Sequence, residues 1–259
     1  GVRLVARREK AQQLIRAGKG RLGDAVLDKP GHEISLEAVP EVTLPPRFVS
    51  RGGEKLAAAL EALPVQVEGR CCLDAGISTG GFSDCLLQHG ASRIYGIDVG
   101  YGQTAWSLRQ DPRVVLRERT NLRHLTPEDL YGPGDPQPDL AVADLSFISL
   151  SRVLEPMQGL LAGGPQAEAV LLVKPQFEVC REGVGQGGVV RDPKAHADAI
   201  ALVAAAAEPL QWFPQGLVES PITGAAGNHE YLLWLGPKAE LDSNAWTALI
   251  EEVVQRTNA

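Results

Sequence analysis

From about residue 65, strand-like and helix-like runs alternate along the chain, and this pattern restricts the possible fold more than any other feature. Apolar runs with the length of a strand cover residues 70–74, 93–98, 114–117, 139–144 and 169–173. Runs with helical spacing separate the first four, near residues 81–88, 102–109 and 126–130, and another covers 149–162. Such an alternation predicts an α/β fold with a mostly parallel, doubly wound sheet and helices on both of its faces.

The last third of the chain extends this pattern. An alanine-rich helix is expected over residues 193–207, and two further strands over 217–220 and 231–235. A turn between these two strands would close a seven-stranded sheet with an antiparallel edge, which is common in mixed sheets. The final segment, 244–255, has the apolar spacing of an amphipathic helix, with Trp246, Leu249, Ile250 and Val253 on one side.

A smaller α+β domain is expected before this sheet. Residues 1–19 have helical spacing and end at glycines, and strand-like segments follow at 25–27 and 39–44, with a turn at 28–31 between them. The dipeptide Pro45-Pro46 has the composition of a linker. We therefore predict two domains, residues 1–45 and 46–259.

Charge is distributed unevenly between these two parts. The whole chain carries a net charge of −7, yet residues 1–23 hold seven Arg and Lys residues against Glu9 alone, so that 7 − 1 = +6. The remainder then carries −7 − 6 = −13. A basic end on an acidic body suggests a local phosphate-binding face, although a solvated helix without a partner would have the same composition.

Composition excludes several other classes. The longest purely apolar stretch, Ala199–Ala207, is far shorter than the roughly 20 residues of a membrane-spanning helix, and no signal peptide is recognisable. The four cysteines, at positions 71, 72, 85 and 180, form no Cys-x-x-Cys pair. We expect reduced thiols, a cytoplasmic protein and no metal site.

A glycine-containing loop lies between the first predicted strand and its helix. Its sequence, from Asp74 through Ala75, Gly76, Ile77, Ser78, Thr79, Gly80 and Gly81 to Phe82, matches neither the dinucleotide nor the triphosphate motif. The second strand ends at Asp98, whose carboxylate can accept hydrogen bonds from both hydroxyls of an adenosine ribose. An acidic loop with this carboxylate would suit a cationic sulfonium cofactor, and the alternative is a tight turn with a surface acid.

Two lysines and two carboxylates are expected at the same edge of the sheet. Asp144 and Lys174 end the fourth and fifth strands, Glu230 begins the last strand, and Lys55 lies shortly before the sheet. A ribose hydroxyl is a poor nucleophile that loses its proton as a methyl group is transferred to it. A lysine can act as the base only when its pKa falls towards neutrality; burial and a nearby cation lower such a pKa, whereas nearby carboxylates raise it. His229 is a rival base.

A further glycine-rich stretch covers residues 182–188. It has the composition of a mobile loop near the substrate entrance, and the alternative is a plain surface linker.

Several segments, taken together and in order, resemble the TlyA-type ribosomal RNA methyltransferases, which are often labelled haemolysins and are related to FtsJ-like 2'-O-methyltransferases. The most specific are Ser50-Arg51-Gly52-Gly53, Asp98-Val99-Gly100-Tyr101-Gly102-Gln103 and Val173-Lys174-Pro175-Gln176-Phe177-Glu178. The resemblance implies a Rossmann-like methyltransferase sheet and a truncated RNA-binding domain like that of ribosomal protein S-four. It also implies that Lys55, Asp144, Lys174 and Glu230 form the active site, with Lys174 as the base.

The resemblance further implies that S-adenosylmethionine and ribosomal RNA are the ligands. The cofactor would contact Asp74, Gly76, Ser78, Thr79, Gly80, Gly81, Phe82, Asp98, Val99, Asn121 and Asp144. The residues expected to contact RNA phosphates are Arg7, Arg8, Arg16, Arg21 and Arg51. The expected reaction is methylation of a ribose 2'-hydroxyl, with cytidine as the nucleoside. Two alternatives remain: an RNA-binding module without catalysis, and a membrane-active haemolysin.

Overall fold

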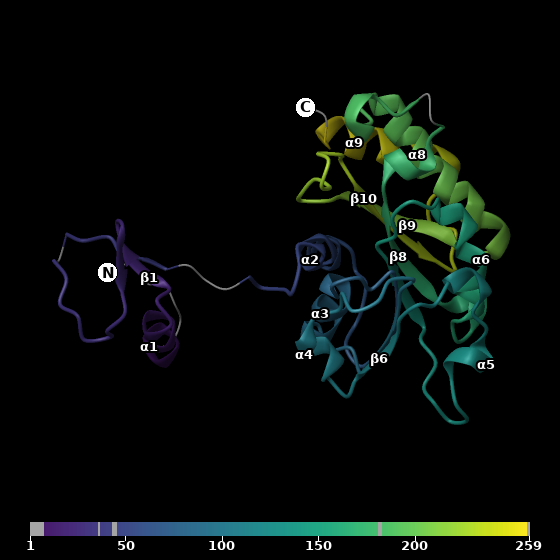
Figure 1. Cartoon of the computed structure of the whole chain (residues 1–259). Helices are drawn as coiled ribbons and strands as arrows, with labels where there is room; N and C mark the ends of the chain where they lie inside the picture. Colours follow the sequence, from purple (N-terminus) through teal and green to yellow (C-terminus); the bar gives the residue numbers. More distant parts are fainter. Residues whose placement is uncertain (1–7, 36, 43–45, 181–182, 258–259) are drawn as a thin grey trace. The chain divides into compact units, whose positions relative to one another are not determined.

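A computed structural model describes residues 8–35, 37–42, 46–180 and 183–257 (Figure 1). The chain forms two compact units, Gly1–Arg47 and Phe48–Ala259, which are described separately here. The smaller unit contains helix α1 (Arg8–Arg16) and an antiparallel sheet in the order β2-β1-β3. These strands are β1 (Gly20–Leu22), β2 (Ala25–Leu27) and β3 (Glu41–Val42).

The end of α1 follows from Gly18. This residue has a φ angle of +66°, which glycine adopts without steric cost, and its amide donates to the Ile15 carbonyl oxygen over 2.9 Å. The Lys19 amide then donates to the Leu14 carbonyl oxygen, and the chain turns into β1. The sequence did not predict β1, because this three-residue strand has no apolar alternation.

The larger unit is built on a seven-stranded sheet in the order β6-β5-β4-β7-β8-β10-β9. The strands are β4 (Cys71–Ala75), β5 (Arg93–Ile97), β6 (Val114–Arg117), β7 (Leu140–Ala143), β8 (Glu168–Val173), β9 (Phe213–Glu219) and β10 (Tyr231–Gly236). The first five pair in parallel, whereas β10 pairs antiparallel with both β8 and β9. The predicted α/β fold with a Rossmann-like sheet and an antiparallel edge is confirmed.

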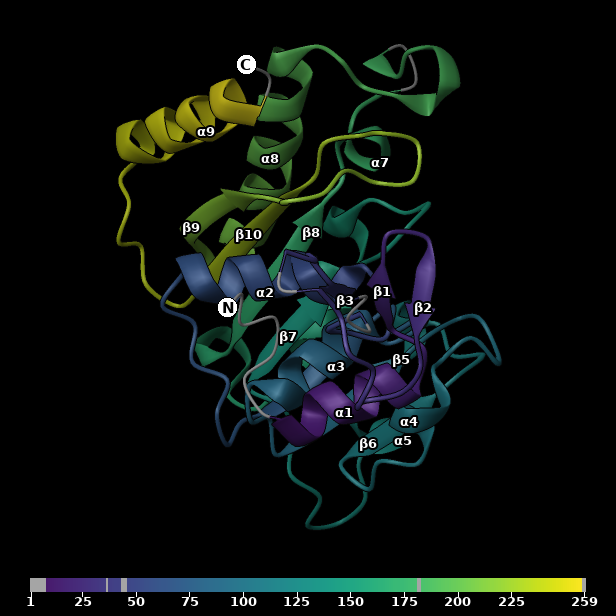
Figure 2. The ribbon, with the colours of Figure 1, turned by 90° about the vertical axis from the view of Figure 1, so that its left-hand side faces the viewer.

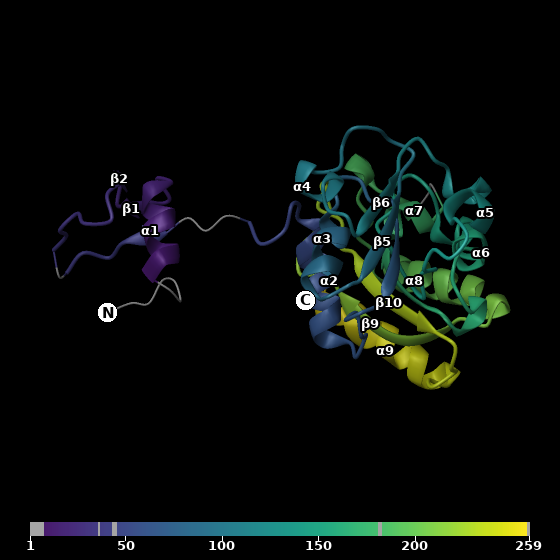
Figure 3. The same ribbon diagram turned by 90° about the horizontal axis from the view of Figure 1, so that it is seen from below.

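Helices cover both faces of this sheet (Figure 3). One face carries α2 (Gly52–Ala62), α3 (Gly81–Gln88) and α4 (Trp106–Arg109). The other carries α5 (Pro127–Leu130), α6 (Leu154–Gly159), α8 (Pro193–Ala207) and α9 (Ser243–Thr257). Side chains of alternate residues along each strand point to opposite faces of the sheet. In β4, Cys72 packs on the face covered by α2, α3 and α4, whereas Leu73 and Ala75 pack on the other face.

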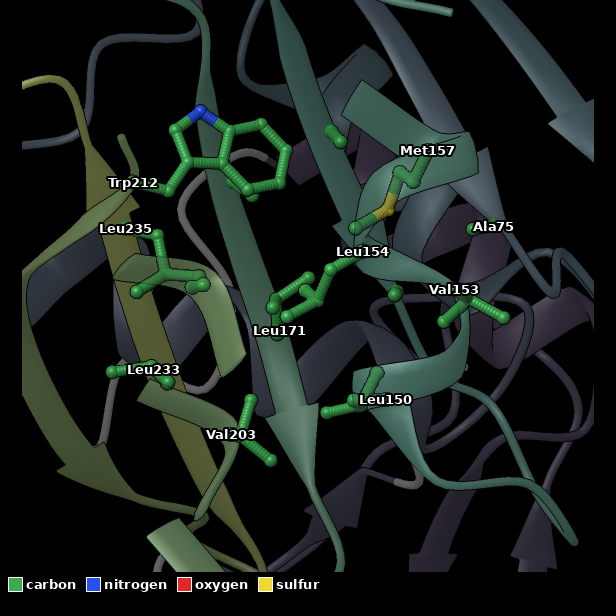
Figure 4. Packing of buried hydrophobic residues seen from close by; sticks show 14 of the residues in the cluster. Ala75, Leu150, Val153, Leu154, Met157, Leu171, Val203, Trp212, Leu233 and Leu235 are labelled. Carbon is green, nitrogen blue, oxygen red and sulfur yellow. The ribbon is translucent and has the colours of Figure 1, made fainter. Parts of the chain in front are cut away.

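The core on the α6–α8 face is assembled around large side chains (Figure 4). Trp212 is fully buried there, and its indole N–H donates to the Ala167 carbonyl oxygen over 2.9 Å, so its polar atom is satisfied. Met157 and Leu154 of α6 are also fully buried beside strand β8. This packing fixes β8 between its neighbours and thereby the place where the strand ends.

In the larger unit, two helix predictions differ from the structure and the first helix was not predicted. Helix α2 was not predicted, although Leu56, Ala57 and Ala59 now lie in the core. The helix expected over 102–109 is confined to α4, because residues 98–105 form an irregular loop with several bends. The helix expected over 149–162 is split into a short 3-10 turn, η2 (Leu150–Arg152), and α6.

The register of the sheet explains how distant residues meet. Tyr231 of β10 lies opposite Val173 of β8 in an antiparallel pair. The residue before Tyr231 and the residue after Val173 therefore lie at the same edge, where β7 also ends (Figure 2). This edge carries Glu230, Lys174 and Asp144.

Candidate active site

A cavity of about 960 Å³ opens at the carboxyl edge of the parallel strands. Its lining includes all four residues of the predicted lysine and carboxylate set: Lys55, Asp144, Lys174 and Glu230. A smaller cavity of about 70 Å³ adjoins the loop after β4 and shares Ser50, Gly52, Gly76, Ser78 and Asp144 with the larger one. Ligands commonly bind at this edge of open α/β sheets.

Lys174 is held by the loop that follows β7. Its Nζ atom lies 2.6 Å from Oδ1 of Asp144 and donates to the Ser146 hydroxyl over 2.9 Å. The side chain is nearly buried, and the Phe177 ring centroid lies 5.9 Å from Nζ. The ammonium group therefore has fixed partners and a defined direction, although the sequence had not indicated Ser146.

Lys55 forms a second, more deeply buried pair. Its ammonium group makes an ion pair and a hydrogen bond with Oε2 of Glu230, which is only 3% exposed. The two residues are 175 positions apart in the sequence. Lys55 lies on α2 and Glu230 directly precedes β10. Both lysines of the predicted set therefore have a carboxylate partner.

The helix α7 (Pro175–Glu178) begins directly after Lys174. Glu178 at its end accepts hydrogen bonds from the Ser149 hydroxyl over 2.6 Å and the Leu150 amide over 2.9 Å. Burial raises the pKa of Glu178, whereas these two hydrogen bonds lower it. The carboxylate thus ties the loop after β8 to the loop after β7 and supports the contact between Lys174 and Asp144.

The loop after β4 is held by Asp98 at the end of β5. One carboxylate oxygen of Asp98 accepts from the Ser78 amide and the other from the Gly100 amide, each over 2.7 Å. Ser78 has a φ angle of +49°, a conformation that costs a non-glycine residue of order 1 kcal/mol. The Thr104 hydroxyl donates to the Ser78 carbonyl oxygen over 3.0 Å and helps to stabilise this conformation.

Close packing explains two glycines of this loop. At Gly76, with a φ angle of +85°, a Cβ atom would lie 2.8 Å from the Leu145 side chain and 3.0 Å from the Asp144 carbonyl oxygen. At Gly80, with a φ angle of +101°, a Cβ atom would collide with the Leu108 side chain. Glycine at position 76 lets the loop approach the end of β7, and glycine at position 80 lets it pack against Leu108 of α4.

Asp74 does not take the expected place at the mouth of the loop. The residue is fully buried and lines neither cavity. Its Oδ2 accepts from the Ser83 hydroxyl over 2.6 Å, and Oδ1 has no hydrogen-bond partner within the described residues. Burial, opposed by Ser83, raises the pKa of Asp74 to about 7. The expected direct contact with the cofactor is not supported, because strand alternation turns this side chain towards α3.

The other predicted cofactor residues divide between the two cavities. Thr79, Gly81 and Phe82 line the smaller one, and Asp98, Val99 and Asn121 line the larger one, while Gly80 lines neither. Asn121 also accepts from the Arg123 amide over 3.1 Å at the start of a 3-10 turn, η1 (Leu122–His124).

The structure adds aromatic residues that the sequence had not indicated. Phe147 is 92% exposed, has a φ angle of +64° and lines the larger cavity. Its ring centroid lies 5.3 Å from that of Phe177. An exposed aromatic ring in an unfavourable backbone conformation is not explained by packing. The sequence feature that could have indicated Phe147 is its position three residues after Asp144, in the loop at the carboxyl end of β7.

The predicted phosphate contacts lie on both units. Arg8 and Arg16 are exposed on α1, and Arg21 is exposed on β1, where its guanidinium donates to the Asp24 carbonyl oxygen over 3.1 Å. Arg51 is exposed and lines the larger cavity. Arg7 lies outside the described residues.

Three further expectations concern His229, the glycine-rich stretch and metals. His229 is not among the described residues that line either cavity. Gly187 and Gly188 line the larger cavity, so this part of the glycine-rich stretch lies at the site, and its mobility stays a prediction. Glu182 lies outside the described residues.

Where the structure describes the chain, no cluster of three or more His, Cys, Asp or Glu side chains is placed to bind a metal ion. Nor does any described helix combine the length and apolarity needed to cross a bilayer.

The sheet order, with its antiparallel edge strand β10 beside β8, is typical of Rossmann-like methyltransferases, and the match to a methyltransferase family model assigns the chain to this class. The family is equally clear. The model of the FtsJ-like methyltransferase family matches residues 48–237, and the chain belongs to that family.

Relatives agree with this assignment. The chain is 48% identical over 255 residues to the 16S/23S rRNA (cytidine-2'-O)-methyltransferase TlyA of Mycobacterium tuberculosis, covering 98% of this chain and 92% of that protein. It is 37% identical to Hemolysin A of Brachyspira hyodysenteriae, over 87% of this chain and 92% of that protein. A crystal structure of a Lactococcus lactis protein, provisionally named a hemolysin, is 42% identical and superposes with a TM-score of 0.75, over 83% of this chain and all of that one.

Proposed function

We propose that this protein transfers a methyl group from S-adenosylmethionine to a ribose 2'-hydroxyl, that of cytidine, in ribosomal RNA. The observation that carries the proposal is the position of the Lys174 ammonium group, held between Asp144 and Ser146 in the cavity that also contains Asp98. The relative TlyA of Mycobacterium tuberculosis, a 16S/23S rRNA (cytidine-2'-O)-methyltransferase, supports the choice of substrate.

The residues present fit the proposed cofactor. Each carboxylate oxygen of Asp98 accepts one amide hydrogen bond, and a carboxylate has about four lone-pair sites, so acceptors remain for the two hydroxyls of an adenosine ribose. The negative charge of Asp98 also makes that part of the cavity favourable for a positively charged ligand. S-adenosylmethionine, when bound, supplies an electrophilic methyl group.

The chain's own residues would act on the hydroxyl. As the ribose oxygen bonds to the methyl carbon, the bond from that carbon to the sulfonium sulfur would break and leave a neutral thioether. The hydroxyl proton would pass to Nζ of Lys174, which accepts it as the free amine. Asp144 and Ser146 fix the direction of Nζ, and the pair of Lys55 and Glu230 holds the substrate beside it. Positioning the hydroxyl in line with the methyl group would supply much of the remaining rate.

We propose that residues 1–45 act as an RNA-binding domain that delivers ribosomal RNA to this site in the cytoplasm. The support is charge, because Arg8, Arg16 and Arg21 are exposed on one small unit. Replacing Arg8 and Arg16 with Glu should weaken RNA binding and flatten its salt dependence, since each lost phosphate contact reduces counterion release. Reversal of Arg256 on α9, another exposed arginine, is the matched control.

Nucleoside mapping tests the function directly. Ribosomal RNA from cells lacking the gene would be incubated with the purified protein and S-adenosylmethionine, digested and examined for 2'-O-methylcytidine by mass spectrometry. The proposal predicts that 2'-O-methylcytidine appears only in the RNA incubated with the protein and S-adenosylmethionine. Binding of RNA and cofactor without methyl transfer would instead identify a catalytically silent RNA-binding module.

A further inference from the structure

A buried side-chain network outside the lysine and carboxylate set fastens the segment 183–190 to the region that carries Glu230. The Val190 amide donates to Oδ1 of Asn228 over 2.9 Å, and Nδ2 of Asn228 donates to the Gly188 carbonyl oxygen over 2.9 Å. Asn228 and Val190 are each only 1% exposed. Both polar ends of this amide are therefore used to hold one segment of backbone.

His196 of α8 provides a second attachment at the same place. Its Nε2 lies 2.9 Å from the Val190 carbonyl oxygen, and its Nδ1 lies 2.7 Å from the hydroxyl of Tyr231. A carbonyl oxygen only accepts, so Nε2 carries the proton and Nδ1 accepts from the tyrosine. The ring is fully buried, and burial lowers the pKa of His196, which favours the neutral form that this arrangement requires.

The network lies directly behind the cavity wall. Gly187, Gly188 and Asn228 line the cavity, and Glu230 lies two residues after Asn228. Gly187 and Gly188 have φ angles near +77°, which glycine adopts without steric cost. Because glycine also adopts many other backbone conformations, this segment needs further contacts to keep one path. The hydrogen bonds that Asn228 and His196 make with Gly188 and Val190 restrict the backbone conformation of this segment beside the start of β10.

The sheet order indicates which ligand this wall faces. Asp98 and Asn121 follow β5 and β6, at one end of the order, whereas Lys174 and Glu230 flank β8 and β10, towards the other end. Gly187 and Gly188 form a wall of the cavity on the side of Lys174 and Glu230, because Asn228 binds Gly188 close to the start of β10. It therefore faces the RNA substrate rather than the nucleoside part of the cofactor.

We propose that Asn228 and His196 are positioning residues that hold segment 183–190 as the substrate-side wall of the cavity. This inference rests on the proposed RNA methyltransferase function. Neither side chain exchanges a proton or a group with the substrate; each acts through the backbone that it binds. Their loss should weaken productive RNA binding and leave cofactor binding intact.

The test uses His196→Leu, which fills the space without hydrogen bonds, and His196→Gln, which restores a donor and an acceptor. For His196→Leu, the KM for ribosomal RNA should rise about tenfold, the factor expected when one or two positioning hydrogen bonds are lost. The kcat and the Kd for S-adenosylmethionine should change little, and His196→Gln should recover most of the loss. Lys194→Ala, at an exposed ion pair on the same helix, is the matched control.

Hydrogen exchange provides a readout that does not depend on activity. The Val190 amide should exchange faster in His196→Leu, which loses the bond to the Val190 carbonyl oxygen, and in Asn228→Ala, which removes the acceptor of that amide. Asn228→Ala also serves if His196→Leu fails to fold. An unchanged KM for RNA in folded variants, or an equal loss of RNA and cofactor binding, would overturn the inference. If the unaltered protein methylates no ribosomal RNA, the proposed function fails, whereas the exchange result still tests the network.

Discussion

The ammonium nitrogen of Lys174 lies 2.6 Å from Oδ1 of Asp144, so that residues ending two adjacent parallel strands form one ion pair. The same nitrogen donates to Ser146, which lies in the loop after Asp144. This arrangement fixes Nζ in the cavity and makes Asp144 the residue on which its direction depends.

Replacing Asp144 should reduce the rate of methyl transfer much more than it reduces stability. Asp144→Asn keeps the shape of the side chain but removes the charge that orients Lys174, and kcat should fall by about 100-fold. The carboxylate is a quarter exposed, so the free energy of unfolding should change by only about 1 kcal/mol. Single-turnover kinetics with radiolabelled cofactor and urea unfolding measure the two quantities. A variant with normal kcat would show that the pair does not orient the base.

Asp74 should make stability depend on pH. Its pKa is raised by burial to about 7, above the ordinary value of the unfolded chain, so the folded protein binds a proton that the unfolded protein releases. The free energy of unfolding should therefore fall as the pH rises towards 7, and this loss should be complete above that pH.

Asp74→Asn isolates this effect, because it cannot ionise and still accepts a hydrogen bond from Ser83. Relative to the unaltered protein, the variant should become more stable as the pH rises from about 5 to about 8. Urea unfolding across this range measures the difference. Parallel profiles for the two proteins would exclude Asp74 as the titrating group.

Gly80→Ala should destabilise the cofactor loop by about 3 kcal/mol, because it adds both a collision with Leu108 and a residue at a φ angle of +101°. Gly69→Ala is the control, since Gly69 has a φ angle of +77° with no atom within 4 Å of an added Cβ. That change should cost only about 1 kcal/mol. Thermal unfolding would compare them, and equal losses would show that contact with Leu108 contributes nothing.

Phe147→Ala should weaken RNA binding, because unpaired bases stack on exposed aromatic rings and such stacking contributes about 1–3 kcal/mol per base. The ring is 92% exposed beside Phe177 at the cavity, so its loss should not affect the fold. The KM for ribosomal RNA should rise by about tenfold or more. Trp106→Ala removes another exposed aromatic ring, one that does not line the cavity, and should leave KM unchanged. Equal effects of the two substitutions would count against stacking at the site.

The sequence predicted most of the sheet because buried parallel strands are short apolar runs between turns. Strands β4–β8 therefore lie within a residue or two of their expected positions. Helix α2 was overlooked because Gly52 and Gly53 at its start are weak helix formers, although Leu56, Ala57 and Leu60 follow them.

The site was less predictable than the fold. The pairing of Lys55 with Glu230 joins a residue of α2 to the residue directly before β10, and no local pattern connects them. By contrast, the burial of Asp74 was accessible to sequence reasoning. Side chains alternate along a strand, so Asp74 lies on the same face as Cys72, beneath α3. The network around His196 involves backbone atoms of a glycine-rich segment, whose path a sequence does not specify.

The most direct measurement is transfer of a radiolabelled methyl group to ribosomal RNA by the unaltered protein and by Lys174→Ala, with cofactor binding followed by calorimetry. The account predicts that the unaltered protein labels a ribose 2'-oxygen, and that Lys174→Ala binds the cofactor with similar Kd but transfers at least about 100-fold more slowly. Transfer by folded Lys174→Ala at the normal rate would contradict it.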